Sequence, residues 1–250
     1  MNHLKPISLK SIIWIFGGTL IPILLGVYVI LPVLVVNKIP FFVGYLICFQ
    51  TIPFLIIFFL AIALYKKEGN PLNWKAFQER MRLKFNGKIL ISSIGLLLFG
   101  LITYFLLQSV TKKIASTPFF APPSWFGAGL HPLKTDLPGN FMGMPLAGAI
   151  WAPIIYLIGW FFNITGEELL FRGYLIPRME LTFANKAWLI NGVCWWLWHC
   201  FWRWQMVALL PFIFLLPLVA QKTKSTIPGM FAHGIMNFIS IILISLIVFR

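Results

Sequence analysis

The sequence predicts an all-α membrane protein: a polytopic transmembrane bundle of seven or eight helices, some of them kinked, around a polar cavity within the membrane. Three observations lead to this fold class. Hydrophobic residues make up 60% of the chain and charged residues only 10%, which excludes an ordinary soluble domain. Several apolar runs reach about 18 residues, the length at which a run is taken for a membrane-spanning helix. Acidic residues number only six, and two of them are adjacent beside such a run.

The apolar runs predict seven spans in chain order. A first span of this length exceeds a signal-peptide core and has no clear small-residue cleavage site after it, so it is expected to remain as an anchor. Pro22, Pro32 and Pro53 should kink the first two spans. An eighth, re-entrant piece could lie in the long break at 111–145. The predicted spans are 12–36, 41–65, 89–110, 146–165, 187–202, 205–220 and 228–249.

The chain is expected to divide into two parts. Residues 1–145 form an N-terminal scaffold, and residues 146–250 form a membrane core that carries the chemistry. Within the scaffold, apolar residues recur at helical spacing near 73–85, which predicts an amphipathic helix on the cytoplasmic membrane surface. Proline, glycine and aromatic residues in 111–145 predict an irregular external loop, held against the bundle by Phe119, Phe120, Trp125 and Phe126.

The formal charge of +14 reflects membrane topology and not nucleic-acid binding, because the basic residues are distributed among short loops. With seven spans and the N-terminus inside, the cytoplasmic segments hold fourteen of the twenty Lys and Arg residues. We therefore expect a multi-pass protein of the cell membrane with a cytoplasmic N-terminus. Cys48, Cys194 and Cys200 form no CxxC pair and are expected to be buried apolar residues.

The two adjacent acids, Glu167 and Glu168, are the most informative residues of the chain. Placing a carboxylate at membrane depth costs roughly 2.5–3.5 kcal/mol on insertion scales, so such residues usually mark a functional site. Glu168 and Arg172 are four residues apart, a spacing that suits an ion pair along a helix. Glu167 points about 100° away from Glu168 and is free for another role.

Three further polar residues lie in apolar helices: His199, and the pair His233 and Asn237, which share one helical face. Each alone could be a packing residue or a bridge between helices. Together with the glutamate pair, four such accidents within about 70 residues are improbable. Helix rise puts Glu167 and His199 at nearly the same depth, and it leaves His233 about 10 Å away from that level.

The order and spacing of these residues resemble a known signature. Glu167-Glu168-x-x-x-Arg172, an aromatic residue four before His199, and His233-x-x-x-Asn237 are similar to the three motifs of the CPBP family. These are intramembrane proteases related to the type II CAAX prenyl endopeptidases. The resemblance covers about residues 146–240. In one departure, Trp195 occupies the place where the second motif usually has Phe.

The resemblance implies a role for each residue. Glu167 would be the general base for a water, and His199 would hold that water. His233 and Asn237 would stabilise the oxyanion, while Glu168 and Arg172 would support the site. The desolvation of a buried carboxylate and the strength of donors in a low-dielectric cavity make this division reasonable.

The sequence leaves the metal question open. Two histidines and a glutamate can form a catalytic zinc set, so Glu167, His199 and His233 are candidate ligands. There is no HExxH helix, however, and a metal-free water activated by glutamate is the favoured alternative. A nucleophilic mechanism is disfavoured because Cys200 adjoins His199 and no Gly-x-Ser-x-Gly motif is present.

The predicted function is therefore an intramembrane endopeptidase that acts on a CAAX-type or other membrane-associated peptide. Its expected partners are a peptide or membrane-protein substrate and the lipid bilayer, without nucleic acid and in an oligomeric state left open. The alternative is a non-catalytic membrane scaffold or a bacteriocin self-immunity protein with the same fold. A proton-coupled transporter is disfavoured, because the first three spans contain almost no polar residues beyond Gln50, Thr51 and Gln108.

Overall fold

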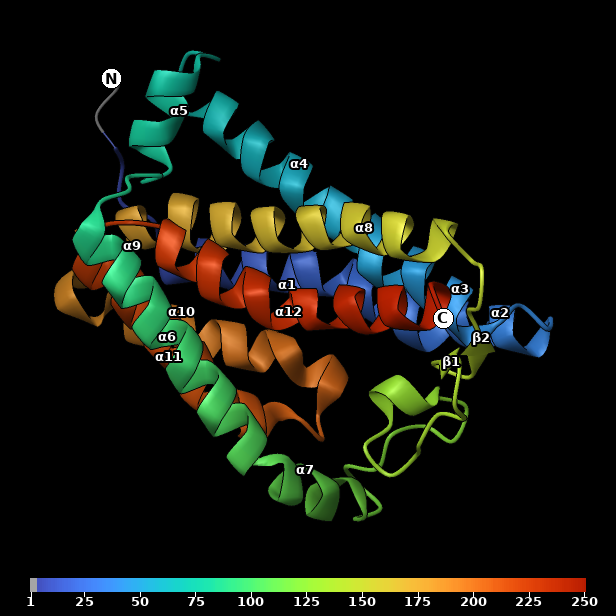
Figure 1. Ribbon diagram of the computed structural model, residues 1–250. Coiled ribbons are helices and arrows are strands. Elements are labelled where there is room, and N and C mark those ends of the chain that lie inside the picture. The colour runs from blue at the N-terminus through green and yellow to red at the C-terminus, as the bar shows by residue number, and fades with distance from the viewer. Residues whose placement is uncertain (1–3) are drawn as a thin grey trace.

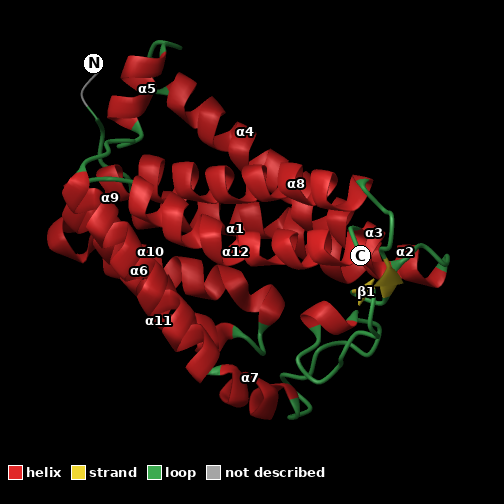
Figure 2. Ribbon diagram, in the orientation of Figure 1, coloured by secondary structure: helices red, strands yellow, loops and turns green. Residues whose placement is uncertain are grey.

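The computed structural model describes residues 4–250, and nearly all regular structure in that part of the chain is helical (Figures 1 and 2). The only strands there are β1 (Asn140–Phe141) and β2 (Met144–Pro145), an antiparallel pair in which Asn140 lies opposite Pro145. The helices are α1 (Leu9–Leu25), α2 (Leu31–Val36), α3 (Phe41–Tyr45), α4 (Ile52–Lys67), α5 (Trp74–Arg80), α6 (Gly87–Leu106), α7 (Gln108–Ala115), α8 (Trp151–Glu167), α9 (Ile176–Phe183), α10 (Ala187–Trp198), α11 (Met206–Thr223) and α12 (Ile227–Val248).

Six stretches of the described chain are long and apolar enough to cross a membrane. One of them, Trp151–Trp202, covers most of the predicted span 146–165 and all of the predicted span 187–202, because it reverses direction at Ala184–Lys186. Hydrogen bonds across this hairpin join Asn191 to the Phe171 carbonyl and Trp195 to Glu167. The all-α multi-pass membrane fold predicted from the sequence is therefore confirmed.

Contacts between chain segments show that the helix ends gather at two ends of the bundle. At one end, Thr226 donates its backbone N–H to Arg82, and Thr182 hydrogen-bonds with Ile7. At the other end, Gly148 donates to Val248. In Figure 1, α8 and α12 run side by side through the middle, while α6 and α11 cross them obliquely.

Proline interrupts the α-helical hydrogen-bond pattern in several helices. π-helical turns at Gly26–Ile30 and Leu46–Thr51 precede Pro32 and Pro53, two of the three prolines at which the sequence predicts kinks. Pro22 instead lies within α1. A third π-helical turn, Glu168–Leu175, precedes Pro177. Proline has no N–H to donate, and π-turns often occur at functional sites.

The amphipathic helix expected near 73–85 is shorter than predicted. Helix α5 ends at Arg80, and the chain turns at Arg82, where φ is 55°. Trp74 and Phe85 are exposed, as a membrane-surface segment requires, but Met81 is fully buried. The segment ends early because the bundle holds it: Arg80 donates to the Gly173 carbonyl, and Thr226 donates to the Met81 carbonyl.

The connection at 111–145 also differs in part from the expectation. Its first residues belong to α7, a helix too short to span a membrane. Phe126 is buried against the bundle, as predicted, whereas Phe119 is exposed. Polar contacts order much of the rest: Arg203 donates to the carbonyls of Phe119 and Ala121, and Asp136 accepts from two backbone N–H groups at the turn of the β hairpin.

Candidate active site

A cavity of about 330 Å³ lies within the apolar part of the bundle and is lined by α6, α8, α10, α11, α12 and the π-turn Leu46–Thr51. Its walls are largely aromatic and aliphatic. The residues on its surface that can carry out chemistry come from α8, α10 and α12 and from the turn that follows α10. They are Asn163, Glu167, Trp195, His199, His233 and Asn237.

Glu167 is the last residue of α8, and only 2% of its surface is exposed to solvent. Its Oε2 accepts a hydrogen bond of 2.8 Å from the indole N–H of Trp195. Within residues 4–250, no hydrogen-bond donor contacts the other carboxylate oxygen, Oε1. One oxygen is thus fixed by the protein, and the second remains available to a molecule in the cavity.

Trp195 also contacts the other ionic and aromatic groups of the site. The guanidinium carbon of Arg172 lies 3.6 Å from the centre of its ring. The rings of His199 and His233 are centred 5.1 and 5.7 Å from it. A cation over an indole face is the most favourable cation–π geometry, so Trp195 helps to hold Arg172 in place.

Glu168 occupies the next position but faces a different set of partners. Its Oε1 accepts from Arg172 Nη1 at 3.2 Å and from His233 Nδ1 at 3.1 Å. Both Glu168 and Arg172 are fully buried. The predicted ion pair along the helix is therefore present, and it extends to His233, a connection that the sequence did not indicate.

Gly229 is the residue that allows Glu168 its position. A Cβ atom at Gly229 would overlap with Glu168 Oε2, because α12 passes directly beside the carboxylate. Removing that overlap would displace Glu168 from Arg172 and His233. Only glycine permits this approach, so the role of Gly229 follows from helix packing and not from backbone conformation.

We expect Gly229→Ala to destabilise the protein by about 1–3 kcal/mol, although alanine normally favours a helix over glycine. Thermal unfolding in detergent micelles measures the change. The matched control is Gly95→Ala in α6, where a Cβ would meet nothing within 4 Å. If Gly229→Ala were as stable as the wild type or more stable, Glu168 could move without a loss of stability.

His199 lies at the end of α10, where the helix tightens into the 3₁₀ turn His199–Trp202. Its Nδ1 lies 2.8 Å from the Trp195 carbonyl oxygen. A carbonyl only accepts, so Nδ1 carries the proton and Nε2 of the neutral ring has a free lone pair. His199 can therefore accept a hydrogen bond from a water in the cavity.

His233 and Asn237 lie one turn apart on α12 and hydrogen-bond to each other. Asn237 Nδ2 is 3.2 Å from His233 Nε2 and 3.3 Å from Asn163 Oδ1. Because Nδ1 of His233 faces a carboxylate, Nε2 is the acceptor in this pair. Sequence reasoning missed Asn163, although its position four residues before Glu167 on the same helix could have revealed it.

The difference in depth that helix rise predicts for His233 and His199 does not keep them apart, since both line the same cavity. The large ring of Trp195 contacts both histidines.

The residues predicted as zinc ligands do not form a metal centre in this arrangement. Within residues 4–250, no three His, Cys, Asp or Glu side chains are grouped closely enough to hold a metal ion. Both ring nitrogens of His233 are already in hydrogen bonds, Nδ1 with Glu168 and Nε2 with Asn237, so this ring has no lone pair left for a metal ion. The candidate set Glu167, His199 and His233 is therefore not arranged as a zinc site here.

The fold and the cavity define a multi-pass helical membrane protein with a polar site inside the bundle, as an intramembrane hydrolase requires. Residues 149–239 match the family described as Type II CAAX prenyl endopeptidase Rce1-like. This segment is similar to that family and includes every site residue from Asn163 to Asn237, which confirms the resemblance predicted from the motifs. The match supports a CAAX-type protease in general. No curated protein and no solved structure matches the chain.

Proposed function

We propose that this protein is an intramembrane endopeptidase in which Glu167 activates the attacking water. The observation that carries the proposal is the Glu167 carboxylate itself. It is buried at the cavity surface, one oxygen is held by Trp195, and no residue of the described chain donates to the other. A carboxylate that is desolvated and oriented in this way is suited to general-base catalysis.

The site can assist each step of peptide hydrolysis. A water between Glu167 Oε1 and His199 Nε2 would direct one hydrogen to each and its lone pair to the scissile carbonyl carbon. Glu167 takes the proton as the C–O bond forms. The carbonyl oxygen becomes an oxyanion, and Glu167 then returns the proton to the leaving amine as the C–N bond breaks.

Asn237 is the donor that supports the developing oxyanion in this proposal. Its two amide hydrogens contact Asn163 and His233 in the absence of substrate. An oxyanion is a stronger acceptor than either group, so one hydrogen turns to it when substrate enters. His233 positions Asn237, and Glu168 with Arg172 positions His233.

The two-part organisation of the chain is consistent with this assignment. The residues to which we assign a chemical role all come from the proposed catalytic part, 146–250. The scaffold part, 1–145, contributes apolar wall residues such as Phe49, Phe54 and Leu101, together with the polar side chains of Tyr45, Gln50 and Tyr104. The substrate class we propose is a CAAX-type or other membrane-associated peptide, because such a wall favours an apolar segment.

We further propose that the protein lies in the cell membrane with its N-terminus in the cytoplasm. Lys and Arg residues gather at the bundle end that holds Lys67, Arg82, Lys186 and Lys224. Basic residues favour the cytoplasmic side of a membrane.

A comparison of protein termini tests the proposed activity. Membranes from cells that produce the wild type are compared with membranes from cells that produce Glu167→Gln at an equal level. New termini present only with the wild type would establish proteolysis and identify the substrate. Identical termini, with both proteins stably inserted, would refute proteolysis and favour the scaffold or immunity alternative.

Replacing Trp195 by Phe tests the hydrogen bond to Glu167. We expect Trp195→Phe to lower kcat by about 10- to 100-fold, since hydrogen bonds to charged groups contribute about 1.5–3 kcal/mol. KM should change little, because the phenyl ring still covers Arg172. The control is Trp196→Phe, which removes an indole N–H that donates to Met206 outside the cavity. Equal rates for the two variants would show that the hydrogen bond from Trp195 to Glu167 does not contribute to catalysis.

A further inference from the structure

A second, larger cavity of about 970 Å³ lies at the proposed cytoplasmic end of the bundle. It is bounded by the segment before α1, the end of α4, the segment around α5 and the start of α9. It shares no lining residue with the catalytic cavity. Five cationic and two anionic side chains line it, so its charge is positive.

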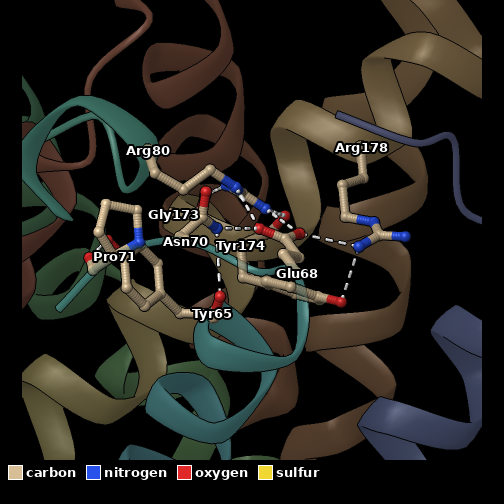
Figure 3. A network of polar contacts seen from close by, with 8 residues as sticks. All are labelled: Tyr65, Glu68, Asn70, Pro71, Arg80, Gly173, Tyr174 and Arg178. Carbon is tan, nitrogen blue, oxygen red and sulfur yellow. Dashed lines mark hydrogen bonds and ion pairs between the residues drawn. The ribbon is translucent and has the colours of Figure 1, made fainter. Parts of the chain in front are cut away.

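The cations of this cavity differ in how far the protein neutralises them. Arg80 makes two hydrogen bonds of 2.6 Å to Glu68, and Arg82 makes two to Glu180. Arg178 gives only Nη1 to Glu68 and Tyr174, and its buried Nε has no hydrogen-bond partner among residues 4–250. Figure 3 shows Glu68 between the guanidinium groups of Arg80 and Arg178.

Glu68 keeps the two arginines in place. Burial raises the pKa of the Glu68 carboxyl, but hydrogen bonds and charge from Arg80, together with donors on Arg178 and Asn70, leave the pKa below its usual value. Glu68 therefore stays anionic. One carboxylate cannot balance both arginines, and the exposed lysines Lys5 and Lys67 add further positive charge.

The rest of the wall is apolar, and the cavity lies where the helices end. Leu4, Ile7, Ile15, Leu64 and Pro177 line it beside the basic residues. Lys5 comes just before α1, and Lys67 is the last residue of α4. These positions correspond to the headgroup level of a bilayer, where basic pockets between helices bind anionic lipid headgroups.

We propose that this cavity binds the phosphate headgroup of an anionic phospholipid, with Lys5, Lys67 and Arg178 around the phosphate and the acyl chains against the apolar wall. The proposal is separate from the proteolytic function. It has a structural consequence, because Arg80 also donates to the carbonyls of Gly173 and Tyr174 in the π-turn that begins with Glu168. The lipid would thus stabilise the segment that carries part of the active site.

Native mass spectrometry of the purified full-length protein tests this proposal. The probes are phosphatidylglycerol and phosphatidylcholine with identical acyl chains. We expect the wild type to bind phosphatidylglycerol at least about 25-fold more tightly, and Lys5→Gln/Lys67→Gln to lose about 25-fold of that affinity, since each basic residue near an anionic surface contributes about a fivefold effect. Lys112→Gln/Lys113→Gln is the control, because these exposed lysines of α7 give the same charge loss far from the cavity.

Two outcomes would overturn the proposal. Equal phosphatidylglycerol affinity in the two double variants would show that any binding is non-specific. Thermal stabilisation of the wild type by inorganic phosphate alone, equal to that by phosphatidylglycerol, would show a small-anion site and exclude the lipid as the required ligand. Arg178→Gln is a further variant that should weaken phosphatidylglycerol binding. If it does not fold, the comparison of Lys5→Gln/Lys67→Gln with the control still tests the proposal.

Discussion

Glu167→Gln is expected to reduce kcat/KM for the identified peptide by a factor between about 10² and 10⁴, the usual contribution of a positioned acid–base group. The amide has nearly the same size as the carboxylate, and its oxygen can still accept the Trp195 N–H. The fold should therefore persist. What is lost is the lone pair that takes a proton from water. The measurement is cleavage in proteoliposomes, with thermal unfolding as a parallel readout.

Two companion variants make this result specific. Glu167→Asp keeps a carboxylate but withdraws it from the cavity, so we expect an activity between those of the wild type and Glu167→Gln. His199→Ala removes the second water contact and should also lower kcat. A Glu167→Gln rate within tenfold of the wild type would show that another group accepts the proton.

The second large effect is expected on stability. Glu168→Gln removes the buried carboxylate that pairs with Arg172, whose Nε and Nη2 already lack hydrogen-bond partners among the described residues. Breaking one side of a buried ion pair destabilises a protein by about 3–5 kcal/mol, because the remaining charge is uncompensated. Unfolding of the purified protein in mixed micelles measures this loss.

The double variant Glu168→Gln/Arg172→Met separates charge from shape. It removes the unpaired cation and leaves an apolar side chain over the Trp195 ring. We expect it to recover at least half of the stability lost in Glu168→Gln, since a buried ion pair is often replaceable by apolar residues. A double variant no more stable than Glu168→Gln would show that hydrogen bonding, and not the buried charge, dominates at this position.

Much of the architecture could be predicted because it depends on local sequence. Apolar runs such as 228–249 correspond closely to helices such as α12, since a membrane-spanning segment must satisfy its own backbone hydrogen bonds. The polar site residues stood out for the same reason. Glu167, His199 and His233 are costly in apolar segments, so their presence there indicated a site before any contact was known.

The tertiary structure decided which of these residues meet. The sequence placed Glu168 beside Arg172. It did not show that His233 also hydrogen-bonds to Glu168, because that contact depends on how α12 is rotated against α8. From the sequence, Trp195 was only the aromatic residue of the second motif. The α9–α10 hairpin brings its N–H to Glu167 as a hydrogen-bond donor. Helical periodicity is a local property, whereas contacts between helices depend on register and rotation set by packing along the whole bundle.

The same distinction explains the differences at the membrane surface. The pattern near 73–85 indicated an amphipathic helix, and the exposed Trp74 agrees with that. Its early end at Arg80 was set by Glu68 and by the Gly173 carbonyl, which belong to other parts of the chain. The sequence by itself thus determined that this is a helical membrane protein with polar groups in its core. Only the packed structure decided which of those groups share a cavity, because hydrophobicity places a residue in the membrane but does not choose its neighbours.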